Sequence, residues 1–288
     1  MLIRIVFHLL ALLPLRALHA LGAFAGWLLW VTHNGRRAVA LKNIALCQPQ
    51  LTPQQQVELA RESIKQEMKS VLESPFFWLA PVDKLLASVV ETRGHEHVDR
   101  ALAHGKGVIV LTPHLGGWEA PGHVYASQRP ITAIYKRQGG AVEDLGVRGR
   151  TRTGAKVVPA DKSAGRAMFN LLQKGESMYF MPDQDPPEGR GVFAPFFGVP
   201  AHTPSLVGRL VQETGAHVVV MYGERLPKGR GFIAHYHEPP AEIYDADPVK
   251  AATAMNASIE RCIRECPEQY WWGYKRFRRR PPGEAPAY

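Results

Sequence analysis

The residues best suited to chemistry are a histidine and a glutamate, His114 and Glu119, which follow a short apolar run. The run Val108–Leu111 predicts a buried strand, and Gly116 and Gly117 predict the start of a helix. On an ideal helix, five residues separate two side chains by about 140°. The pair can therefore meet only if His114 lies in the turn and Glu119 in the first helical turns. A histidine oriented by a carboxylate is typical of a general base. A polar pair at a helix start with a structural role only is the other interpretation.

The same turn offers donors for a developing negative charge. Backbone N–H groups at the start of a helix have no partner within the helix and lie at the positive end of its dipole. Gly116 and Gly117 are therefore the predicted oxyanion donors. The sequence has no Gly-x-Ser-x-Gly motif and no partnered cysteine, so direct attack by a substrate hydroxyl is favoured over a covalent enzyme intermediate.

Three basic residues are candidates for binding a phosphorylated substrate: Lys136, Arg150 and Arg152. The two arginines belong to a predicted basic helix over residues 141–153. Two positions apart on a helix, they diverge by about 200°, so both reach one phosphate only if the helix ends near Gly149. A basic helix face that is merely solvated is the other interpretation.

Two aspartates stand between prolines in the segment Pro182-Asp183-Gln184-Asp185-Pro186. Both are candidates for substrate binding. Asp183 could instead position His114 or an arginine, or it could cap the turn. The sequence leaves these roles open.

Metal-ligating patterns are weak. The three cysteines have no paired metal spacing, which also fits a reducing compartment. The pairs His95/His97 and His235/His237 have no further ligand beside them in the sequence. We therefore expect neither a metal site nor a cofactor.

Net charge indicates the kind of partner. The chain of 288 residues has 35 Lys and Arg against 26 Asp and Glu, a formal charge of +9. Such a surface suits anionic partners such as a membrane, a phosphorylated lipid or an acidic protein. The basic run 275–280 has no nucleic-acid-binding motif beside it, so we expect no nucleic acid and assign the run to lipid headgroups.

Residues 1–33 form the second informative stretch. Between Met1 and Val31 the only charged side chains are Arg4 and Arg16, and a basic cluster follows at once. Arg16 interrupts the apolar core that a cleaved signal peptide requires. The length approaches the roughly 20 residues that span a bilayer, and tryptophans near the basic cluster are typical of an interface. We predict a membrane anchor that spans the bilayer, with an interfacial helix as the alternative.

The remaining chain alternates strands and helices. The predicted strands are residues 131–135, 156–159, 178–181, 217–222 and 231–237, and the predicted helices are residues 84–90, 95–104, 161–174, 203–214 and 249–265. A further helix is expected after Thr52, which with Gln55 has capping-box spacing. This pattern predicts an α/β fold with a mixed central sheet flanked by helices. The expected domains are the anchor, 1–33, and the catalytic domain, 34–288.

Four blocks together resemble a known family. His114-x4-Glu119 after a strand is similar to the first signature of the glycerolipid acyltransferases. Segments 43–52, 183–203 and 269–281 are similar in order to the early, central and C-terminal blocks of the lipid A lauroyl/myristoyl acyltransferases. The resemblance extends from the anchor to about Arg280. It differs in having one arginine, Arg190, after the central aspartates, where relatives often have more basic residues.

This resemblance implies a function. It identifies His114 as the catalytic base and Glu119 as its acidic partner, with Arg150 and Arg152 on an Arg-x-Arg-x-Gly stretch and Asp183 as the acidic residue of the central block. It implies an acyl carrier protein, or acyl-CoA, as donor and a phosphorylated lipid A precursor as acceptor. It also implies a location at the cytoplasmic face of a bacterial inner membrane.

Two alternatives remain. One is acyl transfer to a different lipid, such as a lysophospholipid or an aminolipid. The other is a catalytically idle membrane protein that binds lipid through its basic surface, which gives no reason for the His114/Glu119 pair.

Overall fold

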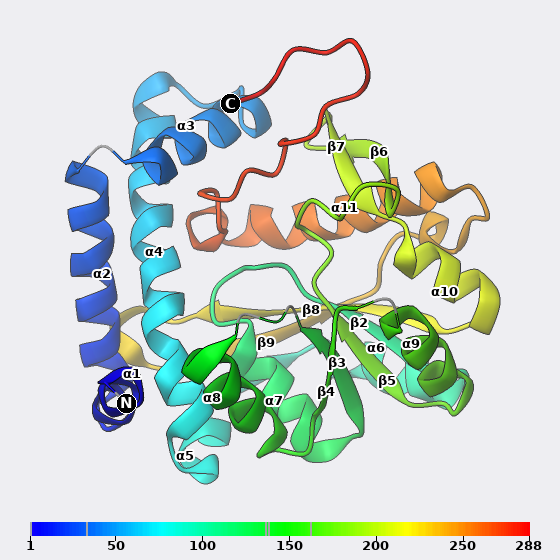
Figure 1. Ribbon diagram of the computed structural model, residues 1–288, viewed down its shortest axis with the longest axis horizontal. Helices are drawn as coiled ribbons and strands as arrows, with labels where there is room; N and C mark the ends of the chain where they lie inside the picture. Colours follow the sequence, from blue (N-terminus) through cyan, green and yellow to red (C-terminus); the bar gives the residue numbers. More distant parts are fainter. Residues whose placement is uncertain (1, 33, 136, 138, 162) are drawn as a thin grey trace.

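Helices and strands alternate along most of the chain (Figure 1). The computed structural model describes residues 2–32, 34–135, 137, 139–161 and 163–288. The helices of the described part are α1 (Leu2–Ala11), α2 (Leu15–Val31), α3 (Gly35–Cys47), α4 (Pro53–Leu79), α5 (Val82–Ala87), α6 (His95–Ala103), α7 (Glu119–Gln128), α8 (Gly140–Thr151), α9 (Ala164–Gln173), α10 (Leu206–Thr214) and α11 (Pro248–Glu265). The strands are β1 (Val89–Arg93), β2 (Val108–Leu111), β3 (Ile131–Tyr135), β4 (Lys156–Pro159), β5 (Ser177–Phe180), β6 (Gly191–Phe196), β7 (Val199–Pro204), β8 (His217–Arg225) and β9 (Phe232–His237). Three short 3₁₀ helices are η1 (Pro227–Gly229), η2 (Ala241–Tyr244) and η3 (Pro267–Gln269).

A seven-stranded sheet forms the centre, in the order β1-β9-β8-β2-β5-β3-β4. Its pairs are parallel except β8–β9, which is antiparallel. The sheet is therefore mixed, as the sequence predicts. Strand β2 lies at its middle and is buried on both faces, which explains its continuous apolar run.

Alternate residues of the central strands face different helices. Ile109 and Leu111 pack in the cluster that includes α9, α10 and α11, whereas Val108 and Val110 pack with α6 and α7. In Figure 1, α10 and α11 lie above the sheet and α7 lies below it. Because side chains alternate along β2, its two faces pack against different helices, and the core has three layers. The C-terminal end of β2 leads into the loop that contains His114.

Helix α4 and helix α2 lie side by side at the left of Figure 1. Thr52 caps α4 together with Gln55 in a capping box, so that prediction is confirmed. Two glycines allow α2 to approach closely, since a Cβ on Gly22 or Gly26 would lie within 2.6 Å of the backbone of α4. Helix α2 is therefore packed on the catalytic part of the chain along much of its length.

Two features differ from the expected elements. The helix expected over 84–90 is divided into α5 and the edge strand β1. Residues 191–204 form the antiparallel pair β6–β7, so the helix expected from 203 begins only at Leu206. Strand β1 pairs with β9, which is distant in the chain and cannot be found from local pattern, whereas β6 and β7 pair with each other as a hairpin.

Candidate active site

The turn after β2 is held by backbone contacts on both sides. Gly116 has φ +58°, and a Cβ there would lie 2.0 Å from the carbonyl oxygen of Gly223. A Cβ on Gly117 would lie 2.2 Å from the ring of Phe232. Glycine is therefore required at both positions, because any side chain would push the turn off the sheet.

The amides of this turn are not free to bind an oxyanion. The Gly116 N–H donates to the carbonyl of Gln269 at 3.1 Å, and the Gly117 N–H donates to the carbonyl of Gly223 at 2.8 Å. The prediction that these two amides form the oxyanion hole is wrong for this conformation. Their hydrogen bonds fix the turn instead.

A buried arginine anchors the same turn from behind. Arg225, at the end of β8, donates to the carbonyl of Gly116 at 2.9 Å and forms two hydrogen bonds to Glu73 of α4, at 2.5 and 2.7 Å. His19 of α2 approaches Glu73 at 2.6 Å. Burial opposes ionisation of Glu73 most strongly, yet the charge and hydrogen bonds of Arg225, with help from His19, hold its pKa below the usual value. These contacts therefore connect α2, α4 and β8 to the turn that contains His114.

Asp183, not Glu119, contacts His114. One carboxylate oxygen of Asp183 lies 2.8 Å from His114 Nδ1, and the other accepts the His114 backbone N–H at 2.9 Å. With Nδ1 protonated and donating to Asp183, the lone pair of Nε2 is left as a hydrogen-bond acceptor. Of the sequence alternatives for Asp183, the structure supports the one in which it positions His114.

The surroundings keep Asp183 ionised. Its side chain is 2% exposed. Burial alone would raise the pKa of this carboxyl, but the charge of His114 and the hydrogen bonds from its ring and backbone hold the pKa below the ordinary value. A buried carboxylate of this kind can stabilise an imidazolium that forms during reaction.

Three side chains that sequence reasoning did not identify lie around the His114 ring. Gln184 places its amide nitrogen 3.3 Å from His114 Nε2. The rings of Trp118 and Trp271 lie edge-on or tilted to the imidazole, with centroids 5.4 Å away. The Trp271 indole nitrogen is buried and has no hydrogen-bond partner among the described residues. An unpaired buried donor beside a candidate base is a signal that only the fold provides.

Glu119 has different partners from those expected. Arg150 donates to both of its carboxylate oxygens, at 2.5 and 3.1 Å, and the Trp78 indole N–H lies 3.1–3.2 Å from them. Burial would raise the pKa of Glu119, but the charge and hydrogen bonds of Arg150, with lesser effects from His123 and Trp78, hold it low. The expected contact with His114 is therefore wrong, because α7 begins at Glu119 and turns its side chain toward α8 and α4.

The three predicted phosphate ligands do not converge. Helix α8 continues through Gly149 to Thr151, so Arg150 and Arg152 diverge. Arg150 faces Glu119, and Arg152 donates to the carbonyl of Ala80 at 2.7 Å. Lys136 lies outside the described residues. The sequence condition for both arginines to share one phosphate is not met.

Asp185 belongs to a neighbouring network. Its carboxylate contacts His202 Nδ1 at 2.9 Å and Arg279 at 2.9 Å. Arg276 is buried and donates to the carbonyl of His202 and to Thr203. Arg276 therefore fastens the C-terminal segment to the β6–β7 hairpin, as does Arg280 through the carbonyl of Pro200, so the assignment of the basic run to lipid headgroups is wrong for these two side chains.

Comparison with known proteins decides the family. The sequence profile described as bacterial lipid A biosynthesis acyltransferase matches residues 1–279. The chain belongs to this family. It is similar to the lipid A biosynthesis lauroyltransferase of Escherichia coli K12, with 27% identity over 98% of this chain and 92% of the relative. It is also similar to the palmitoleoyltransferase of the same organism, with 30% identity over 96% and 90% of the two chains, and to its myristoyltransferase, with 28% identity over 93% and 82%.

The protein is therefore an acyltransferase, and the resemblance recognised in its sequence is confirmed. His114 and Asp183 supply a polar pair, and Gln184 and Trp271 supply donors. Such a set can move a proton and stabilise an oxyanion, which are the two tasks of direct acyl transfer.

The N-terminal helices of this acyltransferase expose many apolar side chains. No helix in the described part is by itself long and apolar enough to cross a membrane. Helices α2 and α3 together meet a test of length and composition only, but they are bent by 89° and flank residue 33, which lies outside the described residues. The exposed apolar side chains of α1, α2 and the turn between them are Leu2, Ile3, Ile5, Val6, Leu9, Leu12, Leu21, Phe24, Trp27, Leu28 and Val31. The anchor stays a prediction.

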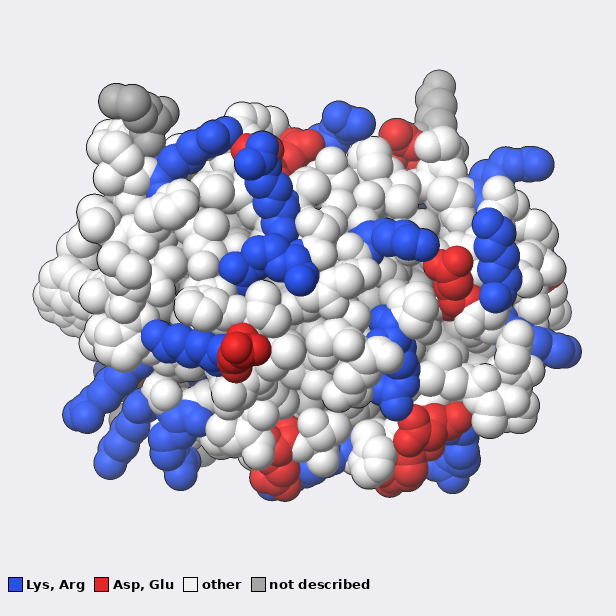
Figure 2. Space-filling view, turned by 90° about the horizontal axis from the view of Figure 1, so that it is seen from below, with Lys and Arg blue, Asp and Glu red and all other residues white. Residues whose placement is uncertain are grey.

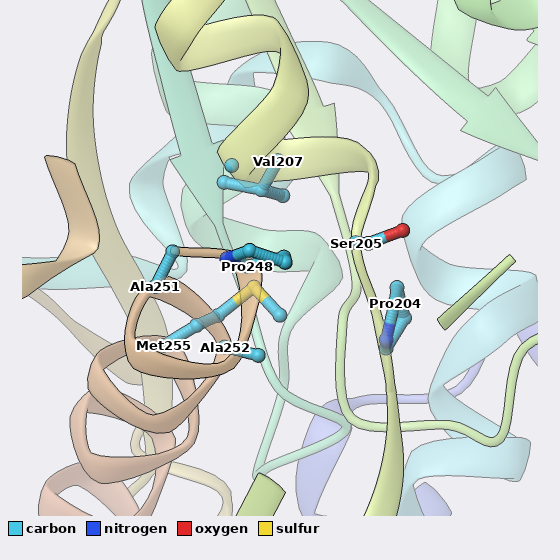
Figure 3. A pocket seen from close by; sticks show the side chains of 8 residues that line it. Pro204, Ser205, Val207, Pro248, Ala251, Ala252 and Met255 are labelled. Atoms are coloured by element: carbon cyan, nitrogen blue, oxygen red, sulfur yellow. The ribbon is translucent and has the colours of Figure 1, made fainter. Parts of the chain in front are cut away.

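Two hollows differ sharply in size. The one in Figure 3 has a volume of about 10 Å³ between α10 and α11 and contains none of the site residues, so at most one water fits it. The other is open, has a volume of about 600 Å³, and lies between α3 and the C-terminal segment. Its lining includes Arg36, Lys42, Lys275 and Gly273. Gly273 stands two residues after Trp271, whose N–H donates to the His114 carbonyl, so this hollow adjoins the segment packed on the site.

Proposed function

We propose that the protein transfers a fatty acyl chain from a thioester donor to a hydroxyl of a phosphorylated lipid A precursor, with His114 as general base and Asp183 as its orienting carboxylate. The observation that carries the proposal is the double contact of Asp183 with the His114 ring and backbone. It fixes both the position of the ring and the tautomer that leaves Nε2 as an acceptor.

The reaction needs no group beyond these residues and the two substrates. The acceptor hydroxyl displaces the Gln184 amide from His114 Nε2, and that nitrogen takes the hydroxyl proton as the oxygen attacks the thioester carbon. The resulting tetrahedral intermediate collapses, the carbon–sulfur bond breaks, and the thiolate recovers the proton from His114. Asp183 stabilises the imidazolium between the two steps.

We assign oxyanion stabilisation to side chains. The Gly116 and Gly117 amides already donate to carbonyls, whereas the Trp271 indole N–H has no acceptor among the described residues. Trp271 and the displaced Gln184 amide are therefore the proposed donors. Glu119 and Arg150 keep a supporting part: their ion pair joins α7 to α8 next to the turn.

The acceptor's phosphate is assigned to the open hollow lined by Arg36, Lys42 and Lys275. The cations of Lys42 and Lys275, the volume of the hollow and its continuity with the Trp271 segment support this assignment, whereas Arg36 is already paired with Glu67. The partly exposed guanidinium of Arg150 is the competing phosphate ligand, although two of its nitrogens already donate to Glu119.

The donor in this proposal is acyl carrier protein, with acyl-CoA as the alternative, and the site of action is the cytoplasmic face of the bacterial inner membrane. In Figure 2, lysine and arginine side chains are spread over the face seen from below, and acidic side chains occur in fewer places. At the left end, where α1 and α2 lie in Figure 1, this basic surface borders an uncharged area. An apolar surface beside basic side chains suits helices that lie in a membrane interface.

One experiment tests the function. Full-length protein in detergent is given labelled acyl carrier protein thioester and a lipid A precursor, either phosphorylated or dephosphorylated, and products are followed by mass spectrometry. We expect His114→Ala to lower turnover by about 10²–10⁴-fold with unchanged folding. Lys42→Ala should raise KM selectively for the phosphorylated acceptor.

Three outcomes contradict parts of the proposal. A folded His114→Ala variant with wild-type turnover removes the general base. Selectivity for phosphate that is lost in Arg150→Ala but kept in Lys42→Ala moves the phosphate site to α8. Transfer to a lysophospholipid or an aminolipid, but not to the lipid A precursor, replaces the acceptor.

A further inference from the structure

Two histidines and a glutamate converge on the face of the sheet covered by α11. His235 and His237 alternate along β9 and therefore share that face. Glu265, the last residue of α11, lies opposite them. One ring nitrogen of each histidine and one carboxylate oxygen of Glu265 all lie within 4.8 Å of one another. No third ligand for this histidine pair can be identified from sequence alone, and the fold supplies one.

One pair of donor atoms has the spacing of a coordination shell, and all three donor atoms lie within 4.8 Å of one another. His237 Nε2 lies 3.5 Å from a Glu265 oxygen, too far for a good hydrogen bond, and it has no hydrogen-bond partner among the described residues. Ligands around a tetrahedral zinc ion with bonds of about 2.0–2.2 Å lie roughly 3.3–3.6 Å apart. Little movement is needed to place an ion between these two atoms.

Neighbouring groups would orient such ligands. The Tyr222 hydroxyl donates to the other oxygen of Glu265 at 2.5 Å, and its ring stacks on His235 with centroids 4.5 Å apart. Glu224 lies 2.9 Å from His235 Nε2 and holds that ring. Outer hydrogen bonds of this kind are a regular feature of protein metal sites.

The cluster is reachable from solvent. The side chain of Glu265 is 37% exposed and that of His237 is 15% exposed. Arg261, one turn earlier on α11, approaches the same Glu265 oxygen at 3.8 Å but is itself largely exposed, so it can move aside.

We propose that His235, His237 and Glu265 form a binding site for a divalent transition metal, of which Zn²⁺ is the best match. Two imidazoles and one carboxylate are a ligand set that zinc accepts, and water would complete the shell. The site is independent of the His114 chemistry.

Its position suggests what the ion does. It would clamp the C-terminal end of α11 to β9. The chain leaves α11 for the segment in which Gln269 accepts the Gly116 N–H and Trp271 donates to the His114 carbonyl. On the other side, Gly223, next to Tyr222, accepts the Gly117 N–H. A bound ion would therefore stabilise both supports of the His114 turn without touching substrate.

The test is titration of full-length, chelator-treated and desalted protein with zinc chloride by isothermal calorimetry. We expect one ion per chain with a Kd below about 10 μM, and a rise in Tm on binding. Cobalt chloride should give the visible absorption of a cobalt ion bound by protein ligands. His237→Ala and the near-isosteric Glu265→Gln should each weaken zinc binding at least about tenfold.

The matched control is His217→Ala. His217 stacks on His104 with ring centroids 3.8 Å apart, and this pair has no third ligand within the described residues. The variant His217→Ala should leave the zinc affinity unchanged. Circular dichroism and the Tm of each metal-free variant establish that the variants are folded. Absence of saturable zinc binding in wild type overturns the proposal, as does equal weakening by His217→Ala and Glu265→Gln.

Discussion

Replacing Asp183 with asparagine separates the contact seen in the structure from the one expected from sequence. Asparagine keeps the size of the side chain and can still accept the Nδ1 proton of His114, but it has no charge to offer the imidazolium. If Asp183 orients and stabilises the base, turnover falls. If Glu119 had that role, the same substitution would leave the chemistry largely intact.

The size of the effect can be worked from the geometry. A hydrogen bond to a charged group contributes about 1.5–3 kcal/mol. Two unit charges about 4 Å apart interact by roughly 4 kcal/mol at an effective dielectric constant of 20. His114 and Asp183 are in direct contact at 2.8 Å, and the carboxylate is buried. A loss of about 2–4 kcal/mol of transition-state stabilisation corresponds to about a 30- to 900-fold decrease in kcat.

Asp185 provides the matched control. It lies two residues further along, is equally buried, and contacts a different histidine, His202, at 2.9 Å. Single-turnover assays with saturating acyl donor, together with Tm measurements, compare Asp183→Asn with Asp185→Asn. We expect similar losses of stability but a much larger loss of kcat for Asp183→Asn. Equal losses of kcat, or a wild-type rate for Asp183→Asn, would refute the proposed role.

Three further outcomes are expected. Glu119→Gln leaves Arg150 without its counter-charge and should lower the free energy of unfolding by roughly 1–3 kcal/mol, a range reduced because Arg150 is partly exposed. Adding Arg150→Met should restore part of the lost free energy of unfolding. The absence of any recovery in denaturant melts contradicts the pairing. Burial lowers the pKa of His123 from 6.5 to about 4, so the unfolded chain binds the proton first. The stability contributed by neutral His123 is present above pH 6.5 and is lost as pH falls toward 4, by about 3 kcal/mol. His123→Gln should flatten this part of the curve of stability against pH, and an unchanged curve refutes this role of His123. Replacing the exposed Phe24 and Trp27 with serine should weaken sedimentation with anionic lipid vesicles while the Tm stays within a few degrees, and undiminished sedimentation argues against an interfacial α2.

The turn around His114 could be predicted from sequence because its signals are local. Four apolar residues bounded by Gly107 and Pro113 indicate a buried strand, and the two glycines mark the close approach to Gly223 and Phe232. The strands at the middle of the sheet and the capped start of α4 were predictable for the same reason. In each case the side chains that decide the conformation lie within a few residues of it.

The partner of His114 could not be chosen from sequence because it lies 69 residues away. Strands β2 and β5 are adjacent and parallel, so the loops after both strands lie at the same edge of the sheet. Asp183 arrives at His114 through that pairing, whereas Glu119 is close in sequence but faces α8. Parallel neighbours, not helical spacing, decide which carboxylate meets the base.

The same reasoning explains why N-terminal truncation is a poor test of membrane binding. Leu18 and His19 are buried, and His19 contacts Glu73 at 2.6 Å. Glu73 binds Arg225, which holds the carbonyl of Gly116 at 2.9 Å. Removal of α2 would therefore expose a charged network that supports the catalytic turn, and activity would fall whether or not the helix binds lipid. The segment predicted as a separate anchor is, through its buried face, a part of the active-site scaffold, and only its exposed face is free to meet a membrane.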